Sequence, residues 1–343
     1  MSDSGSAGIS ASIFKQHAAA LTALKPDKAP GAQRLIPYGT RGSQRGFFMP
    51  YLPVLLGLST AFCWGTSDYL SRSQSEKVGH YNTVVYMHVT TLLILLVLLP
   101  ILTPSVSVTP LAALALVAAG ALNFFAFIYL YRAFHKGVVS VVAPVAYTYP
   151  VVTTVFSVLF LGVVLAPVRI ASIGCVVAGV LLLSTRFSEL RRYQGGSGLP
   201  SLTAGVGSAL VSSIFFGMVY VGIGYATPVA GYVLPVVFLR GVGTVVGIVA
   251  APVLRESIRP TRLSFSRVIM AMGVLEAIGF LAFNYGLSLG SDSLPEIAAI
   301  SGMGGAVAAL YALKFLKERL ERNQAIGLGL AIAGVFALLY LGG

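Results

Sequence analysis

Charged residues are scarce in this sequence of 343 residues. Only 10% of the residues are Asp, Glu, Lys or Arg, whereas soluble domains contain about 25%. This scarcity excludes an ordinary water-soluble protein. Hydrophobic residues make up 56% of the chain, and the mean hydropathy is +0.86, which excludes a disordered chain as well. The composition therefore predicts an integral membrane protein.

The sequence has only two cysteines and no nucleotide-binding loop of the Walker type. The two cysteines, Cys63 and Cys175, both lie inside apolar runs, so neither a disulfide framework nor a metal-ligand spacing can be built from them. The sequence contains no Walker-type Gly-Lys-Thr/Ser loop, and we therefore expect no hydrolysis of ATP by this chain. We expect no metal ion and no other cofactor.

Residues 1–48 differ in composition from the rest of the chain. They are rich in Ser, Ala, Gly and Pro, and their basic residues outnumber the acids Asp3 and Asp27. No long apolar segment precedes a small-residue cleavage site, which argues against a secretory signal. We predict a disordered basic tail. A simpler alternative is that translation starts at Met49, because Met49-Pro50-Tyr51 directly precedes the first apolar run.

From Tyr51 onward, apolar runs recur that are about 20 residues long, enough to cross a hydrocarbon core of about 30 Å as a helix. The runs are continuous rather than alternating, which excludes a lipid-facing barrel. Turn-rich or charge-rich segments, such as 72–79 and 132–137, separate the runs. The sequence thus predicts an all-α integral membrane protein with ten transmembrane helices. The expected spans begin near Tyr51, Tyr81, Leu111, Val138, Arg169, Leu202, Tyr232, Phe265, Ser293 and Gln324.

The two halves of the chain repeat each other. Matching motifs recur at offsets of 152 to 155 residues: Trp64-Gly65 with Phe216-Gly217, Gly137 with Gly290, and Ala178-Gly179-Val180 with Ala333-Gly334-Val335. An odd number of spans in each unit forces the second unit to run inverted in the membrane. We therefore predict two inverted five-helix repeats, at residues 51–186 and 201–341, joined by a linker at 187–200. Inverted repeats place a transported ligand near the midplane, between the two copies.

The distribution of the basic residues indicates how the chain is oriented in the membrane rather than binding to nucleic acid. The chain has 23 Lys and Arg against 11 Asp and Glu, but the basic residues are scattered between apolar runs, so we expect no nucleic-acid partner. Loops after even-numbered spans hold only Arg169, and the positive-inside rule then places both termini outside. The basic tail argues the other way unless the chain starts at Met49. Loops after odd-numbered spans hold Arg72, Lys77, Arg132, Lys136, Arg186, Arg191, Arg192, Arg255, Arg259, Arg262, Arg267, Lys314, Lys317, Arg319 and Arg322.

A set of ordered motifs resembles a known family. The motifs are Trp64-Gly65, residues 137–144, Tyr149-Pro150 leading into residues 159–162, residues 315–320, Gly327 and Gly334-Val335. Together they resemble the EamA-type members of the drug/metabolite transporter superfamily, over roughly residues 51–341. The resemblance implies ten helices in two inverted repeats, a central cavity lined largely by spans 4 and 9, and secondary transport of small metabolites. It does not imply a particular substrate.

Polar residues occupy equivalent positions deep in the spans of both halves. The repeat pairs His88 with Arg240 at an offset of 152, and Asn123 with Glu276 at 153. Ionisable residues at membrane depth cost at least about 2.5 kcal/mol each, so they persist mainly where a pathway or a partner needs them. We interpret this set as part of a substrate or ion pathway, with Glu276 as the candidate for proton coupling. The alternative is an Arg240–Glu276 ion pair that only holds spans 7 and 8 together.

Further candidate residues lie at the ends of spans or are aromatic. Asp68, near the end of span 1, is either part of the pathway or a solvated helix end. Glu296 follows Pro295 at the start of span 9, where an acid also complements the helix dipole. Three aromatic residues could stack on a substrate or simply pack: Trp64, Tyr147 and Tyr149.

Residues that break helices mark spans 4 and 9. Pro144 and Pro150 remove backbone donors from span 4, and Gly302, Gly304 and Gly305 loosen span 9 at the corresponding place. Such breaks are tolerated where protein or a cavity covers the freed backbone. We predict that these residues are hinges.

The function most consistent with these patterns is secondary active transport. We expect an exporter or exchanger of small polar or amphipathic metabolites such as amino acids, working by alternating access, with coupling to protons as one form of the hypothesis. Its partners would be the small-molecule substrate and the lipid bilayer, most simply in the plasma (inner) membrane. Two alternatives remain open. An intramembrane enzyme would need a nucleophile–base set or a metal cluster, and a channel would need rings of repeated charge.

Overall fold

The part of the chain described by the computed structural model is helical, with no strand in it. It comprises residues 51–103, 107–136, 142, 145–194, 204–260, 263–289, 293–307, 310–311 and 321–341. The all-α prediction is confirmed for these residues. The expected tail at 1–48 and the expected hinge Pro144 lie outside them.

The helices follow each other in two similar series. Those of the first half are α2 (Leu52–Val78), α3 (His80–Leu102), α4 (Pro110–Lys136), α6 (Tyr149–Leu161) and α7 (Pro167–Ser184). A short helix, α8 (Phe187–Gln194), follows them. Those of the second half are α10 (Val206–Ala230), α11 (Leu234–Val253), α12 (Arg267–Ser288), α13 (Leu294–Ser301) and α15 (Arg322–Leu341). Six of these helices are long and apolar enough to cross a membrane: α3, α4, α7, α10, α11 and α12.

Proline and glycine set many of the helix boundaries. Proline lies in the first turn of α2, α6, α7, α11 and α13, where its missing N–H has no helical partner to lose. Gly79, with φ of 83°, ends α2. The expected breaks at 72–79 and 132–137 are wrong in their extent, because α2 continues to Val78 and α4 to Lys136. Charged residues are good helix formers, so a run of charge ends the apolar stretch without ending the helix.

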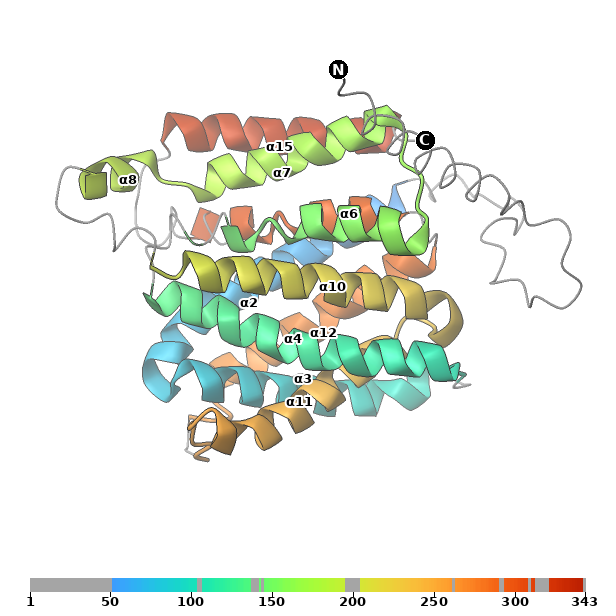
Figure 1. The fold of residues 1–343 in the computed structure, drawn as a ribbon, viewed down its shortest axis with the longest axis vertical. Helices are drawn as coiled ribbons and strands as arrows, with labels where there is room; N and C mark the ends of the chain where they lie inside the picture. Colours follow the sequence, from blue (N-terminus) through green and yellow to red (C-terminus); the bar gives the residue numbers. More distant parts are fainter. Residues whose placement is uncertain are drawn as a thin grey trace, which may run out of the picture. The chain divides into compact units, whose positions relative to one another are not determined.

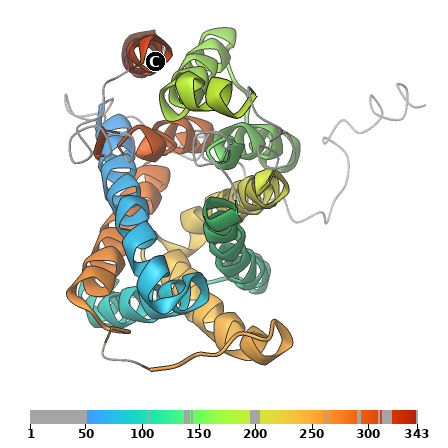
Figure 2. The same cartoon turned by 90° about the vertical axis from the view of Figure 1, so that its left-hand side faces the viewer.

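The most extensive contacts between a helix of the first half and a helix of the second half each have a counterpart between the equivalent helices. α4 packs on α10 and on α11, and correspondingly α12 packs on α2 and on α3. α6 packs on α10 as α13 packs on α2, while α3 packs on α11, α6 on α13 and α7 on α15. In Figure 1, α7 and α15 lie side by side at one end of the array and α3 and α11 at the other. Figure 2 shows the same helices nearly end-on. This exchange pattern indicates an approximate two-fold axis between the repeats.

Equivalent close contacts occur on both sides of this axis. A Cβ atom at Gly65 of α2 would clash with the carbonyl oxygen of Gly304, and one at Gly217 of α10 would clash with Val152 of α6. Gly65 and Gly217 are the glycines of the repeated motif. Only a residue without a side chain lets the two backbones approach so closely. The repeated glycines therefore set the spacing between α2 and the backbone at Gly304, and between α10 and α6.

The outward faces of the helices are apolar. Ile101 of α3 is 71% exposed, Phe160 of α6 is 72% exposed and Val249 of α11 is 65% exposed. The polar residues Asn123 and Arg240, by contrast, are fully buried. A soluble protein would show the reverse distribution. This arrangement fits helices surrounded by hydrocarbon, with polar groups satisfied inside the bundle.

Candidate functional site

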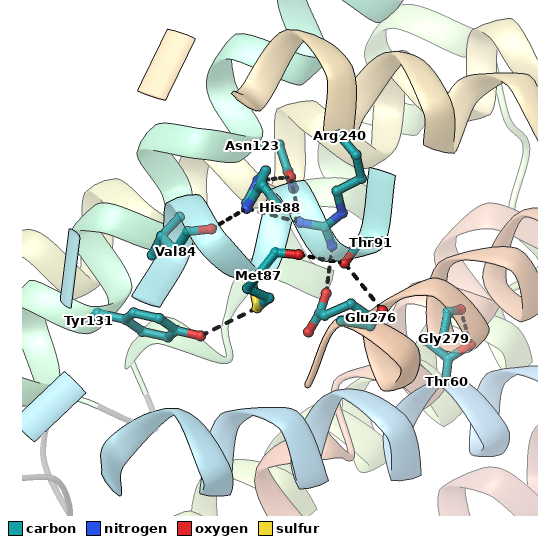
Figure 3. A network of polar contacts seen from close by, with 11 residues as sticks. Thr60, Val84, Met87, His88, Thr91, Asn123, Tyr131, Arg240, Glu276 and Gly279 are labelled. Atoms are coloured by element: carbon teal, nitrogen blue, oxygen red, sulfur yellow. Dashed lines mark hydrogen bonds and ion pairs between the residues drawn. The ribbon is translucent and has the colours of Figure 1, made fainter. Parts of the chain in front are cut away.

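A network of four buried polar residues lies where α3, α4, α11 and α12 meet. His88, Asn123, Arg240 and Glu276 each come from a different helix, and each is at most 1% exposed (Figure 3). The two repeats contribute two residues each. The structure thus brings together the residues that the repeat alignment paired, although they lie far apart in sequence.

Arg240 is the centre of this network. Its Nη2 donates to Oε2 of Glu276 at 2.5 Å, and its Nη1 lies 3.1 Å from Nε2 of His88 (Figure 3). Its guanidinium also lies over two aromatic rings, 4.6 Å from the ring centre of Phe280 and 5.4 Å from that of Phe127. These contacts combine an ion pair, hydrogen bonds and two cation–π interactions. The Arg240–Glu276 ion pair expected as the structural alternative is therefore present.

The contacts of His88 favour one neutral form of its ring. Nδ1 lies 3.0 Å from the carbonyl oxygen of Val84, which can only accept a hydrogen bond. Nδ1 therefore carries the proton of the neutral ring, and Nε2 faces the guanidinium of Arg240 at 3.1 Å and Oδ1 of Asn123 at 3.3 Å. The ring thus helps to orient the arginine that pairs with Glu276.

Two pairs of equivalent residues contact each other directly. His88 meets Arg240, and the hydroxyl of Tyr149 lies 3.0 Å from that of Ser301, with 152 positions between the partners in both cases. A residue can touch its own counterpart only beside the axis that relates the two. The buried network and the Tyr149–Ser301 contact therefore both lie on the approximate two-fold axis.

A partly open cavity lies between the repeats beside this network. Its wall includes residues at the breaks of two helices. Tyr147 lies in the turn before α6, and Ser301 ends α13, after which the backbone turns at residues 302–303 before it is helical again at 304–307. The lining residues are Trp64, Asp68, Phe127, Leu130, Ala146, Tyr147, Tyr149, Phe216, Tyr220, Glu276, Phe280, Ser301 and Gly304.

Aromatic rings form much of the cavity wall. The ring of Trp64 lies 5.7 Å from that of Tyr220 and 4.7 Å from that of Phe280. Tyr149 lies 5.1 Å from Tyr220, and Phe216 stacks on Tyr220 at 6.2 Å. These rings come from α2, α6, α10 and α12, so both repeats supply them. Such a wall offers flat apolar faces to a bound molecule.

Asp68 is the second carboxylate of the cavity wall. It is half-buried, and its Oδ2 accepts a hydrogen bond of 2.9 Å from the hydroxyl of Tyr147. α2 continues beyond Asp68 to Val78, so Asp68 is not the last residue of its helix. Asp68 therefore faces the cavity from within the helix.

The remaining candidates lie around the cavity rather than in it. Glu296, in the first turn of α13, pairs with Arg169 of α7 at 3.1 Å. A Cβ atom at Gly302 would lie 2.9 Å from the ring of Pro150, and one at Gly305 would lie 2.7 Å from the ring of Tyr147. Of the expected hinge residues, Pro150 and Gly302 thus pack against each other across the repeats, and Gly305 packs against Tyr147.

Seven wall residues were not among those expected from the sequence. They are Phe127, Leu130, Ala146, Phe216, Tyr220, Phe280 and Ser301. A signal existed for two of them, since Phe216 is the repeat counterpart of Trp64 and Ser301 that of Tyr149. The described residues contain no group of three His, Cys, Asp or Glu side chains placed to hold a metal ion.

Comparisons with known proteins agree with this architecture. A crystal structure of a protein with 18% sequence identity aligns with a TM-score of 0.65, over 84% of this chain and 96% of that chain. At this identity it shows the fold alone. A comparison with curated proteins finds no match. The model of the EamA-like transporter family matches twice, over residues 52–185 and 203–340. The chain is a multi-pass membrane protein and belongs to the EamA-like transporter family.

Proposed function

We propose that this protein is a secondary active transporter, an exporter or exchanger of small polar or amphipathic metabolites, the class that includes amino acids. The observation that carries the proposal is the cavity between the two repeats, whose wall includes helix breaks from both. Irregular backbone inside a membrane is tolerated where it lines a cavity, and broken helices at a repeat interface are typical of transporter binding sites.

The proposal includes ten transmembrane spans in two inverted five-helix units. Six helices meet the length for spanning by themselves. The repeated order of helices and the exchange-symmetric contacts support four further spans, built around α2, α6, α13 and α15. We place the protein in the plasma (inner) membrane.

Alternating access would use rocking of the repeats about the breaks. The contact of Pro150 with Gly302 and that of Tyr147 with Gly305 join α6 and α13 beside the cavity. A change in the angle between these helices would open one side of the cavity while closing the other. In the proton-coupled form of the proposal, Glu276 is the coupling group, since its carboxylate faces both the cavity and Arg240.

A flux assay with purified protein in liposomes tests the proposal. A panel of amino acids, nucleosides and organic cations is supplied with and without a pH gradient, and uptake and exchange are measured. Saturable flux that responds to the gradient, with the substrate recovered unchanged, is the expected result. Non-saturable flux would favour a channel, and a chemically altered substrate would favour an enzyme. Absence of flux for the whole panel in folded protein would contradict the proposal for these classes.

A further inference from the structure

The charges on the cavity wall do not balance. Two carboxylates line it, those of Asp68 and Glu276, and among its described lining residues there is no Lys, Arg or His. A cavity buried in a membrane protein exposes its ligand to little water, so the net charge of the wall selects the charge of the ligand. What each carboxylate already contacts therefore decides which charge the cavity can accept.

The charge of Glu276 is already matched. Arg240 contacts it at 2.5 Å from behind the wall and is itself 0% exposed. Both terminal nitrogens of this guanidinium are engaged, one by Glu276 and the other by His88. The pair adds no net charge to the cavity, and the guanidinium is not free to bind an anionic group of a ligand.

The charge of Asp68 is not matched by any cation in the described part of the chain. Its contact in the cavity wall is the neutral hydroxyl of Tyr147, and no Lys or Arg whose side chain the structure describes pairs with it. Asp68 therefore brings to the cavity a carboxyl group without a counter-charge among the described side chains. Trp64, Tyr149 and Tyr220 lie in the same wall, and the faces of such rings attract cations as well as apolar groups.

We propose that the substrate of this cavity is an organic cation with one positive charge and an aromatic or apolar body. Its ammonium group pairs with Asp68, and its body lies against the rings of Trp64, Tyr149 and Tyr220. A zwitterion would bring a carboxylate for which the described wall residues offer no free cation, and an anion would be repelled by the carboxylate of Asp68. This inference rests on the proposed function and narrows its substrate class.

The chain contains its own reporter of binding. Trp64 is the single tryptophan of the sequence and lines the cavity, so its fluorescence reports on a molecule bound there. Four soluble probes share one phenylethyl body and differ in charge: 2-phenylethylammonium, 2-phenylethanol, phenylalanine and 3-phenylpropanoate. Titration of the full-length protein in detergent with each probe separates the contribution of charge from that of the aromatic body.

The expected result is saturable binding of 2-phenylethylammonium that is at least about 10-fold tighter than binding of the other three probes, the equivalent of about 1.4 kcal/mol. Asp68→Asn should abolish this preference and leave the affinity for 2-phenylethanol unchanged. Asp68→Glu, which keeps the charge, should retain the preference and guards against a folding defect. Glu76→Gln is the matched control, since Glu76 is an exposed acid on the same helix; it should bind all probes as the wild type does.

Three outcomes would overturn the inference: equal binding of all four probes, tightest binding of the zwitterion or the anion, or an unchanged preference in folded Asp68→Asn. The liposome assay distinguishes a failure of the cation proposal from a failure of the proposed transport function. Gradient-driven flux of a zwitterion would support the proposed transport function and refute the proposal that the substrate is a cation. Asp68-dependent binding of the cation without any flux would support the proposed binding site and refute the proposed transport function.

Discussion

The ion pair between Arg240 and Glu276 allows a quantitative test of the buried network. Both side chains are at most 2% exposed and are joined at 2.5 Å. Glu276→Gln leaves the guanidinium of Arg240 buried without its counter-charge. Arg240→Gln likewise leaves the carboxylate of Glu276 buried without its counter-charge. Loss of one partner of a buried pair costs about 3–5 kcal/mol of unfolding free energy. Two independent losses would then cost about 6–10 kcal/mol together.

The double variant should lose far less than that sum. It buries no unpaired charge, so its main loss is that of the two cation–π contacts of Arg240 with Phe127 and Phe280, about 1–4 kcal/mol in all. We expect a coupling free energy of about 2 kcal/mol or more. The assay is denaturant unfolding in detergent followed by the fluorescence of Trp64, whose ring is 4.7 Å from that of Phe280. Additive losses, within about 0.5 kcal/mol, would refute the reasoning.

Flux through the same variants tests the role of Glu276 in coupling. If this carboxylate couples protons, Glu276→Gln should lose pH-dependent uptake while it still exchanges substrate for substrate. The glutamine keeps the shape of the side chain but cannot ionise. Full pH-dependent flux in the double variant with Arg240→Gln would show that the pair is only structural.

Three further predictions concern the packing around the cavity and the loops. Gly65→Ala should lower the unfolding free energy by about 1–3 kcal/mol, because its methyl group clashes with backbone of the other repeat, whereas Gly174→Ala, with open space around it, should not. Gly305→Ala should reduce flux several-fold in folded protein, because a methyl group 2.7 Å from the ring of Tyr147 displaces a ring that forms part of the cavity wall. Partial burial raises the pKa of Glu321, but hydrogen bonds from the hydroxyl and the N–H of Ser188 outweigh it and hold this pKa below its usual range. The wild type should therefore be more heat-stable than Glu321→Gln at neutral pH, and the difference should vanish as the pH falls below about 4.

The sequence carried enough information to place the helices and to pair the buried polar residues. Apolar runs of membrane-spanning length mark most helices, and a constant offset between the halves matched His88 with Arg240 and Asn123 with Glu276. The offset works because each repeat folds in the same way, so equivalent residues occupy equivalent depths. The offset does not predict which of these residues contact each other, because these contacts depend on how the two halves pack.

Much of the cavity wall could not be predicted, for a physical reason. The chain has 19 Phe and 16 Tyr, and a helix that is apolar on all sides carries no periodic signal to separate a cavity-facing ring from a lipid-facing one. Phe280 and Tyr220 are therefore indistinguishable in sequence from aromatic residues on the outer surface. The sequence also left two interpretations of Asp68 open, because an acid after an apolar run resembles a helix end, whereas α2 continues to Val78.

The contacts on the two-fold axis bear on why this architecture is made from one chain. In a homodimer of a single five-helix unit, a residue on the axis faces an identical residue of the other copy. Two arginines would then meet at the position of His88 and Arg240, and two prolines or two glycines at that of Pro150 and Gly302. Fusion of the two units removes this restriction, so each position on the axis can hold two different, complementary side chains. A fused chain can therefore place one buried cation where a symmetric assembly must accept either two like charges or none.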